Sequence, residues 1–242
     1  MSLALKLALA PLLVAQALQA RRRLPRLPEA DGPRCGEVGS EVGSGPALSL
    51  LILGDSSAAG VGVATQDEAL AGRLAGALAR RMHARVRWQL RARSGINTTQ
   101  ALALLRESPI GPVDVAVLVT GVNDVVDRIA PRHAVAARAA LVEVLRRDAG
   151  VQHIVLTPVP PMQRFAGLPQ PLRWMAGRDA AVHDRAMARW ASSQDAVAHL
   201  PFDMHLNAKV LAADGFHPGA QVYAVWGAVL AEHIAAALRQ SD

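Results

Sequence analysis

Cysteine is almost absent from this sequence of 242 residues, and Cys35 is its single example. An intramolecular disulfide therefore cannot form, and a thiolate metal cluster is excluded. The histidines are scattered along the chain without the spacing of metal ligands. We therefore expect neither a metal site nor a cofactor.

Nucleotide-binding motifs are missing as well. Gly60 and Gly62 lack the third glycine of a dinucleotide fingerprint, and no Lys-Ser or Lys-Thr pair completes a P-loop. The Gly-x-Ser-x-Gly elbow of α/β-hydrolases is also absent. Lysine is scarce, and the excess of 26 basic over 20 acidic residues gathers into no basic helix, so nucleic-acid binding is not expected.

The apolar segment near the N-terminus is short. Residues 7–20 read LALAPLLVAQALQA after Lys6. This length fits a signal-peptide core of roughly 7 to 15 residues and falls short of a spanning helix of roughly 20. Ala15 and Ala17 offer a small-x-small cleavage pattern, but Arg21–Arg23 follow at once and resist export.

Three interpretations of residues 1–23 stay open at this point. The segment is an interfacial anchor in peripheral contact with a membrane, an exported signal peptide, or a helix packed on the domain. The protein is accordingly expected at the cytoplasmic face of a bacterial membrane or in the periplasm.

The rest of the chain divides into a linker and one domain. Residues 24–46 carry Pro, Gly and Ser without an apolar period, which predicts a linker. The catalytic domain is predicted over residues 47–242. Half of the chain is apolar, and the length suits a single α/β domain.

Strands and helices are predicted to alternate within this domain. Strands are expected at 48–53, 84–93, 113–121, 152–160 and 196–201. Helices are expected at 64–82, 97–108, 134–148, 179–193 and 218–239, the first starting at a capping box of Thr65 and Glu68. Residues 160–178 are predicted as a long loop. Continuous apolar strands between helices indicate a mainly parallel sheet that is covered on both faces.

Polar residues stand where these elements end. GDSS at 54–57 follows the first strand, GVND at 121–124 follows the third, and DGFHP at 214–218 precedes the last helix. Open parallel sheets place their sites at the carboxyl ends of the strands, so we expect the three clusters to meet at one rim. Together they supply a hydroxyl, an imidazole, a carboxylate and an amide, which are the parts of an acyl-transfer site.

The nucleophile and its base are predicted first. Serine is a weak nucleophile unless a base takes its proton, and the His217 imidazole is a base suited to that task for Ser56. Asp214 is predicted to accept a hydrogen bond from the other ring nitrogen, with Asp203 as the alternative. Ser57 is the competing nucleophile, and its side chain is expected to point away.

Stabilisation of the tetrahedral intermediate needs hydrogen-bond donors. The Asn123 amide is one candidate, and the backbone N–H groups of Ser56 and Gly95 are the others. Gly54 and Asp55 are predicted to support the turn that carries the nucleophile.

The blocks GDSS, SGIN, GVND and DGFHP, in this order, resemble those of the GDSL esterases, also called SGNH hydrolases. The resemblance covers about 165 residues from Leu51 onward. Ser57 stands where the family name has leucine. The resemblance implies a flavodoxin-like three-layer α/β/α sandwich with a mainly parallel five-stranded sheet, the SGNH hydrolase fold. It also implies the same roles for the site residues, namely Ser56, Gly95, Asn123, Asp214 and His217.

The resemblance further implies a serine esterase that acts on carboxylic esters with short to medium acyl chains. Apolar residues in the predicted loop over the sheet either favour an acyl chain over a sugar or simply cover the sheet, namely Met162, Phe165, Leu168, Leu172, Trp174 and Met175. An interfacial N-terminus would agree with a lipid-derived ester. The alternatives within the family are a carbohydrate O-acetyl esterase, a thioesterase and a lysophospholipase. A non-catalytic flavodoxin-like binding protein is the alternative from another class.

Overall fold

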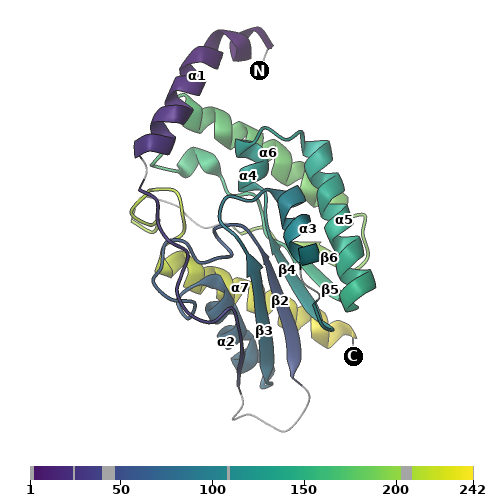
Figure 1. Cartoon of the computed structure of the whole chain (residues 1–242). Helices are drawn as coiled ribbons and strands as arrows, with labels where there is room; N and C mark the ends of the chain where they lie inside the picture. Colours follow the sequence, from purple (N-terminus) through teal and green to yellow (C-terminus); the bar gives the residue numbers. More distant parts are fainter. Residues whose placement is uncertain (1–2, 24, 40–46, 108–109, 203–208, 242) are drawn as a thin grey trace.

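The computed structural model describes residues 3–23, 25–39, 47–107, 110–202 and 209–241. Figure 1 shows a central sheet with helices packed on both faces. The strands are β1 (Cys35–Val38), β2 (Leu48–Gly54), β3 (Val86–Ala92), β4 (Val115–Val119), β5 (His153–Leu156) and β6 (Val197–His199). The helices are α1 (Leu3–Arg23), α2 (Leu70–Met82), α3 (Thr98–Glu107), α4 (Val122–Val126), α5 (Pro131–Ala149), η2 (Met162–Arg164), α6 (Leu172–Ala191) and α7 (Ala220–Ser241).

The sheet has the order β1-β3-β2-β4-β5-β6. Strands β2 to β6 run parallel, and β1 alone pairs antiparallel, with β3. This arrangement confirms the predicted α/β class with a mainly parallel sheet. The pairing register places Gly54 beside both Ala92 and Val119, so β2, β3 and β4 end side by side.

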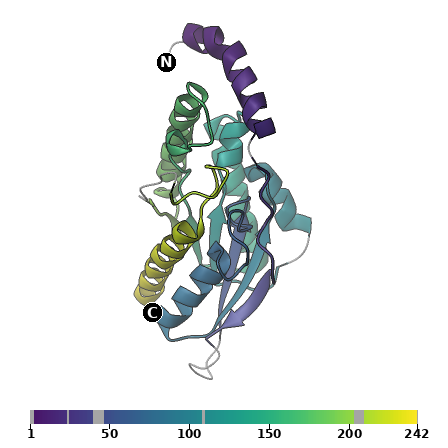
Figure 2. The same ribbon diagram turned by 90° about the vertical axis from the view of Figure 1, so that its left-hand side faces the viewer.

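Alternate residues of β2 enter two separate cores. Leu50 and Ile52 pack with α2 and α7, whereas Leu51 and Leu53 pack with α3, α5 and α6. Because side chains of a strand alternate between its faces, a strand buried on both sides reads as a continuous apolar run. Figure 2 shows the two helical layers from the side.

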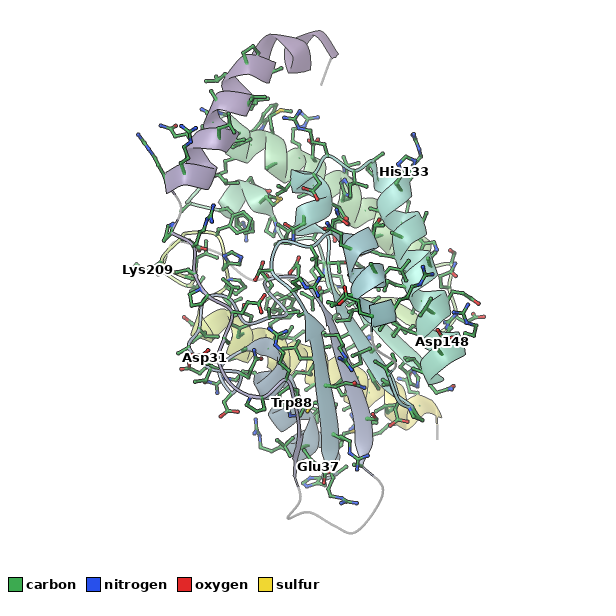
Figure 3. All side chains as sticks on the ribbon, viewed as in Figure 1. Asp31, Glu37, Trp88, His133, Asp148 and Lys209 are labelled. Carbon is green, nitrogen blue, oxygen red and sulfur yellow. The ribbon has the colours of Figure 1, made fainter. Side chains whose placement is uncertain are left out.

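The segment predicted as a linker contains a strand, which corrects the prediction for residues 24–46 and raises the strand count from five to six. In β1, Glu37 pairs with Arg85 and Arg87 at 3.4 Å each, and Gly36 lies against the indole of Trp88 on β3. Figure 3 labels Glu37 and Trp88 on these two strands. The strand has four residues and one glycine, which is too short to show a period. Residues 40–46 lie outside the described part of the chain.

Two helices start well away from their predicted positions, α2 at Leu70 instead of residue 64 and α6 at Leu172 instead of residue 179. Helix α6 begins at Leu172, so the predicted loop 160–178 contains η2 and the first turns of this helix. Prolines in the segment before α6 favoured the prediction of a loop, because Pro171 itself is the N-cap residue of this helix. Helix α2 begins at Leu70, and the Glu68 carboxylate instead accepts a 3.3 Å hydrogen bond from the Ala64 N–H in the preceding turn.

Two apolar helices, α1 and α7, differ in how they pack against the rest of the protein. Among the described helices, α7 has the length and composition of a membrane span, and α1 contains a shorter apolar stretch, Leu9–Ala20. Helix α7 packs against α2 and buries Tyr223, Leu230 and Ile234 in one of the two cores. Helix α1 instead stands at one end of the molecule in both ribbon views.

Candidate active site

The turn that carries Ser56 begins where β2 ends. A Cβ at Gly54 would lie 2.2 Å from the Val119 carbonyl oxygen, so only glycine allows β4 to approach this closely. The next residue, Asp55, donates its N–H to the same carbonyl at 3.0 Å, and the Val61 N–H donates to the Ser56 carbonyl. These bonds turn the chain sharply out of the sheet and present Ser56 at its rim.

A second turn brings a carboxylate and an imidazole to the same place. His217 Nδ1 donates to Asp214 Oδ2 at 2.5 Å, and Ser56 Oγ lies 2.9 Å from His217 Nε2. Asp214 Oδ1 accepts the N–H groups of Phe216 and His217 at 2.9 and 3.0 Å. Gly215 adopts φ +62°, which lets this short turn close. The structure therefore joins the three predicted residues in one chain of hydrogen bonds.

The environment of Asp214 favours its ionised form. Burial raises the pKa of this carboxyl, but hydrogen bonds from the His217 ring, the His217 N–H and the Phe216 N–H outweigh burial and hold the pKa below its ordinary value. A carboxylate only accepts hydrogen bonds, so the proton of a neutral His217 ring resides on Nδ1. Nε2 is then an acceptor for the Ser56 hydroxyl.

The predicted oxyanion donors lie on two neighbouring turns. Asn123 Nδ2 donates to the carbonyl of Ile96 at 2.9 Å, which ties α4 to the turn after β3. Gly95 adopts φ +81° in that turn, and a Cβ there would meet no atom within 4 Å. Glycine is therefore required by the backbone conformation alone. Within the described ranges, the backbone N–H groups of Ser56 and Gly95 donate a hydrogen bond to no protein acceptor.

Beneath Asn123 lies a buried ion pair. Arg138 Nη2 is 3.0 Å from Asp124 Oδ2, and the two side chains are 1% and 0% exposed. The same carboxylate accepts the Thr98 hydroxyl at 2.6 Å and the Thr98 N–H at 3.0 Å. Arg138 also donates to the Thr120 carbonyl at 3.3 Å. This network, which we call the Asp124 cluster, links α3, α4, α5 and the end of β4.

No role for the Asp124 cluster is predicted from the sequence. A signal for it exists in α5, where one charged residue falls on the buried stripe of the helix, which comprises Ala134, Arg138, Leu141 and Leu145. An arginine in an apolar stripe needs a buried partner, because an unpaired charge is costly to bury. The partner itself, Asp124, is distant in sequence and follows from the fold.

Asp55 supports the Ser56 turn from inside the protein. It is 2% exposed, and its Oδ1 accepts the Ser57 N–H at 3.0 Å. Burial raises the pKa of Asp55 from 3.8 to about 7, against the lowering effects of the Ser57 hydrogen bond and nearby His217. Asp55 therefore caps the turn with a carboxyl group that is expensive to ionise.

An apolar pocket adjoins Ser56. It lies between the ends of β4 and β5 and the start of α7, and its walls include Val122, Pro160, Phe165, Phe216, Val222 and Trp226. The stacked rings of Phe202 and Trp226, with centroids 5.9 Å apart, also line it.

The predicted apolar loop residues contribute less to this pocket than expected. Of the six, Phe165 lines it, whereas Met162 and Met175 are buried and Trp174 is 40% exposed. The remaining two, Leu168 and Leu172, are half-buried outside the pocket walls.

Other candidates from the sequence are placed elsewhere or not described. Asp203, the alternative partner for His217, lies outside the described residues. A second histidine–carboxylate pair, His199 Nε2 with Asp184 Oδ1 at 3.0 Å, joins β6 to α6 and does not include Ser56. In the part of the chain that the structure describes, no three His, Cys, Asp or Glu side chains are grouped as metal ligands.

Comparisons with known proteins identify the family of this chain. The model of the GDSL-like Lipase/Acylhydrolase family matches residues 52–225. The chain is 29% identical over 234 residues to the GDSL-like esterase Rv1075c of Mycobacterium tuberculosis, covering 88% of this chain and 73% of that protein.

Solved structures show the same fold. The crystal structure of the lipase Lip_vut3 from a goat rumen metagenome matches with a TM-score of 0.62 and 19% identity, covering 79% of this chain and 97% of that one. A carbohydrate acetylesterase family member from Sinorhizobium meliloti matches with a TM-score of 0.56 and 19% identity, covering 77% and 97%. The chain belongs to the GDSL-like Lipase/Acylhydrolase family and is a serine hydrolase that acts on ester bonds.

Proposed function

We propose that this protein hydrolyses carboxylic esters with short to medium acyl chains, through an acyl-enzyme on Ser56. The observation that carries the proposal is the chain of hydrogen bonds from Ser56 Oγ through the His217 ring to Asp214, with distances of 2.9 and 2.5 Å. This chain adjoins an apolar pocket, which supports an acyl group as the bound part of the substrate.

In the proposed reaction, His217 Nε2 takes the Ser56 proton while Oγ attacks the ester carbonyl. Asp214 orients the ring and stabilises the imidazolium that forms. The N–H groups of Ser56 and Gly95 and the Asn123 amide hold the negative oxygen of the tetrahedral intermediate. The imidazolium then protonates the departing alkoxide, and a water activated by His217 releases the acid from Ser56.

The acyl chain is proposed to lie in the pocket beside Ser56. Its walls are mostly aliphatic and aromatic, with Thr120 and Thr157 among the polar exceptions, so it favours a hydrocarbon chain over a hydroxylated sugar. We expect the acyl chain to contact the stacked pair of Phe202 and Trp226, which lines this pocket. A lipid-derived ester is therefore the natural substrate class that we propose.

Hydrolysis of p-nitrophenyl esters from acetate to decanoate tests the proposal. Ser56→Ala is expected to lower kcat by about 10⁴-fold or more. Ser57→Ala is the matched control, because it removes a neighbouring hydroxyl of the same turn and should retain activity. Equal activity of Ser56→Ala and the unaltered protein would contradict the assignment of the nucleophile. An optimum at acetate with no gain on longer chains would contradict the acyl-pocket assignment and favour acetyl esters.

A further inference from the structure

Helix α1 has two distinct faces over its described side chains. The face turned toward the domain comprises Leu9, Ala10, Leu13, Gln16, Ala17 and Ala20, which are buried or half-buried. The outward face comprises Pro11, Leu12, Val14, Ala15, Leu18, Gln19, Arg22 and Arg23, which are all exposed. This separation follows the helical period, so one face of α1 is covered by the domain and the opposite face is not.

The outward face is apolar where a water-facing helix would be polar. Leu12, Val14 and Leu18 are 47%, 44% and 52% exposed, and no charged residue occurs between positions 7 and 20. The surface helices of soluble domains place charged and polar side chains on the face turned to water. A contiguous exposed apolar face indicates an interaction with a membrane or another protein.

Contacts with α6 hold α1 in this orientation. Gln16 Nε2 donates to the Gln170 carbonyl at 2.6 Å, and its Oε1 accepts the Leu172 N–H at 3.1 Å. Leu13 and Ala20 are each only 8% exposed. Ala15 and Ala17, the small residues of the predicted cleavage pattern, lie inside the helix, and Ala17 is on its docked face. Cleavage after Ala17 would divide this helix and remove the contacts of Gln16 from the domain.

Charge identifies the partner that fits this face. Residues 1–28 contain five basic residues and no acidic one. Of these, Arg22, Arg23 and Arg26 are exposed at the end of α1 and just beyond it. Basic residues beside an apolar helical face are typical of segments that lie on anionic membranes. The apolar stretch is too short to span a bilayer, which needs roughly 20 residues.

We propose that α1 lies flat on an anionic lipid surface, with Leu12, Val14 and Leu18 in the headgroup boundary and Arg22 and Arg23 at the lipid phosphates. The helix remains docked to α6 in this state and acts as a peripheral anchor of the whole domain.

The anchor is connected to the proposed active site. The loop that receives Gln16 continues back to Gly167, whose N–H donates to the Gly215 carbonyl at 3.0 Å. Gly215 lies between Asp214 and His217 in the sequence. Anchoring through α1 would therefore hold the catalytic turn near the lipid surface, a consequence that rests on the proposed function.

Vesicle flotation of the full chain tests the anchor. The protein should float with phosphatidylcholine vesicles that contain about one-quarter phosphatidylglycerol, and much less with phosphatidylcholine alone. Raising the salt from about 0.1 M to about 1 M should weaken binding, because the arginine contribution is screened. Val14→Glu should lower the bound fraction by about tenfold. Val225→Glu is the matched control, because Val225 on α7 is also 44% exposed and should bind as the unaltered protein does.

Several outcomes would overturn the anchor. Absence of flotation, or equal flotation of Val14→Glu and the unaltered protein, would contradict it. A dimer in light scattering that Val14→Glu dissociates, without any vesicle binding, would assign the face to a second copy of this chain. An intact mass that lacks the first 17 residues in cells would assign a signal peptide. Hydrolysis of soluble p-nitrophenyl acetate by Val14→Glu should be unchanged, so loss of activity and loss of anchoring are separate results.

Discussion

Two buried carboxylates near the rim of the sheet, Asp214 and Asp124, differ in the groups that face them. Asp214 faces the ring of His217, whose charge can change, and that ring reaches Ser56. Asp124 faces Arg138, whose charge is permanent, and the hydroxyl and N–H of Thr98. A carboxylate beside a titratable base can assist proton transfer, whereas a carboxylate beside a fixed cation can only hold geometry.

The two carboxylates also differ in their access to solvent and substrate. The Asp214 turn borders a pocket, and the side chain of His217 is 18% exposed, so substrate and water can reach the imidazole. The Asp124 cluster is sealed, and its members bind the segments that carry Asn123 and Gly95. We therefore expect changes at Asp214 to affect activity most, and changes in the Asp124 cluster to affect stability and positioning.

The largest effect is expected for Asp214→Asn. An amide at this position donates as well as accepts, so it favours the wrong tautomer of His217 and no longer stabilises the imidazolium. We expect kcat to fall by about 10⁴-fold while the protein stays folded. Asp184→Asn is the control, because it alters a second histidine–carboxylate pair, 3.0 Å long, that does not include Ser56. Comparable losses of kcat in both variants, measured with the same ester, would show that the role of Asp214 is not specific to its contact with His217.

A smaller effect, mainly on stability, is expected for Asp124→Asn. This change leaves the Arg138 charge buried without a counter-ion, which costs about 3–5 kcal/mol of unfolding free energy. Urea denaturation measures this loss.

The double variant Asp124→Leu with Arg138→Met separates stability from positioning in the same cluster. Removing both charges should recover much of the stability, since an apolar pair can replace a buried ion pair. We expect kcat to remain lowered by about 10²-fold, because the segments of Thr98 and Asn123 are no longer tied together. Full recovery of kcat with stability would show that the cluster has no positioning role.

The third expected effect concerns Asp55, which has no cationic partner of the kind that Asp124 has. Burial raises the pKa of Asp55 to about 7, so between about pH 4 and pH 7 the folded protein binds a proton that the unfolded chain has lost. The free energy of unfolding therefore falls as pH rises through this window. Above pH 7 it stays lower by the full amount.

Replacing Asp55 by Asn keeps an acceptor for the Ser57 N–H and removes the ionisation. The stability of Asp55→Asn relative to the unaltered protein should rise from pH 4 to pH 7, by at most about 4 kcal/mol. Denaturation at several pH values measures this difference. A difference that stays constant across the window would refute the raised pKa.

The Asp214 turn and the Asp124 cluster also differ in how far sequence predicts them. Ser56 and His217 stand at the ends of strongly apolar or helical segments, and parallel strands that end together bring such positions to one rim. Their convergence was therefore predictable from chain order. The sequence around Arg138 indicates only that a charged side chain is buried. Its partner, Asp124, lies on another helix, 14 residues earlier in the chain.

The elements that were mispredicted lack a strong local pattern. Strand β1 has four residues, and it is stabilised by pairing with β3 and by contact of Gly36 with Trp88, which no local window contains. The start of α6 follows several prolines, a composition that favours a loop unless tertiary contacts decide otherwise. Long, periodic segments such as α7 were placed to within a few residues.

Covalent labelling of the folded chain with a fluorophosphonate probe, followed by peptide mapping, tests directly whether Ser56 is the nucleophile. We expect a single modified residue, Ser56, and loss of labelling in His217→Ala, since the imidazole activates the hydroxyl. An unlabelled folded protein, or a label on Ser57 with Ser56 unmodified, would contradict this assignment.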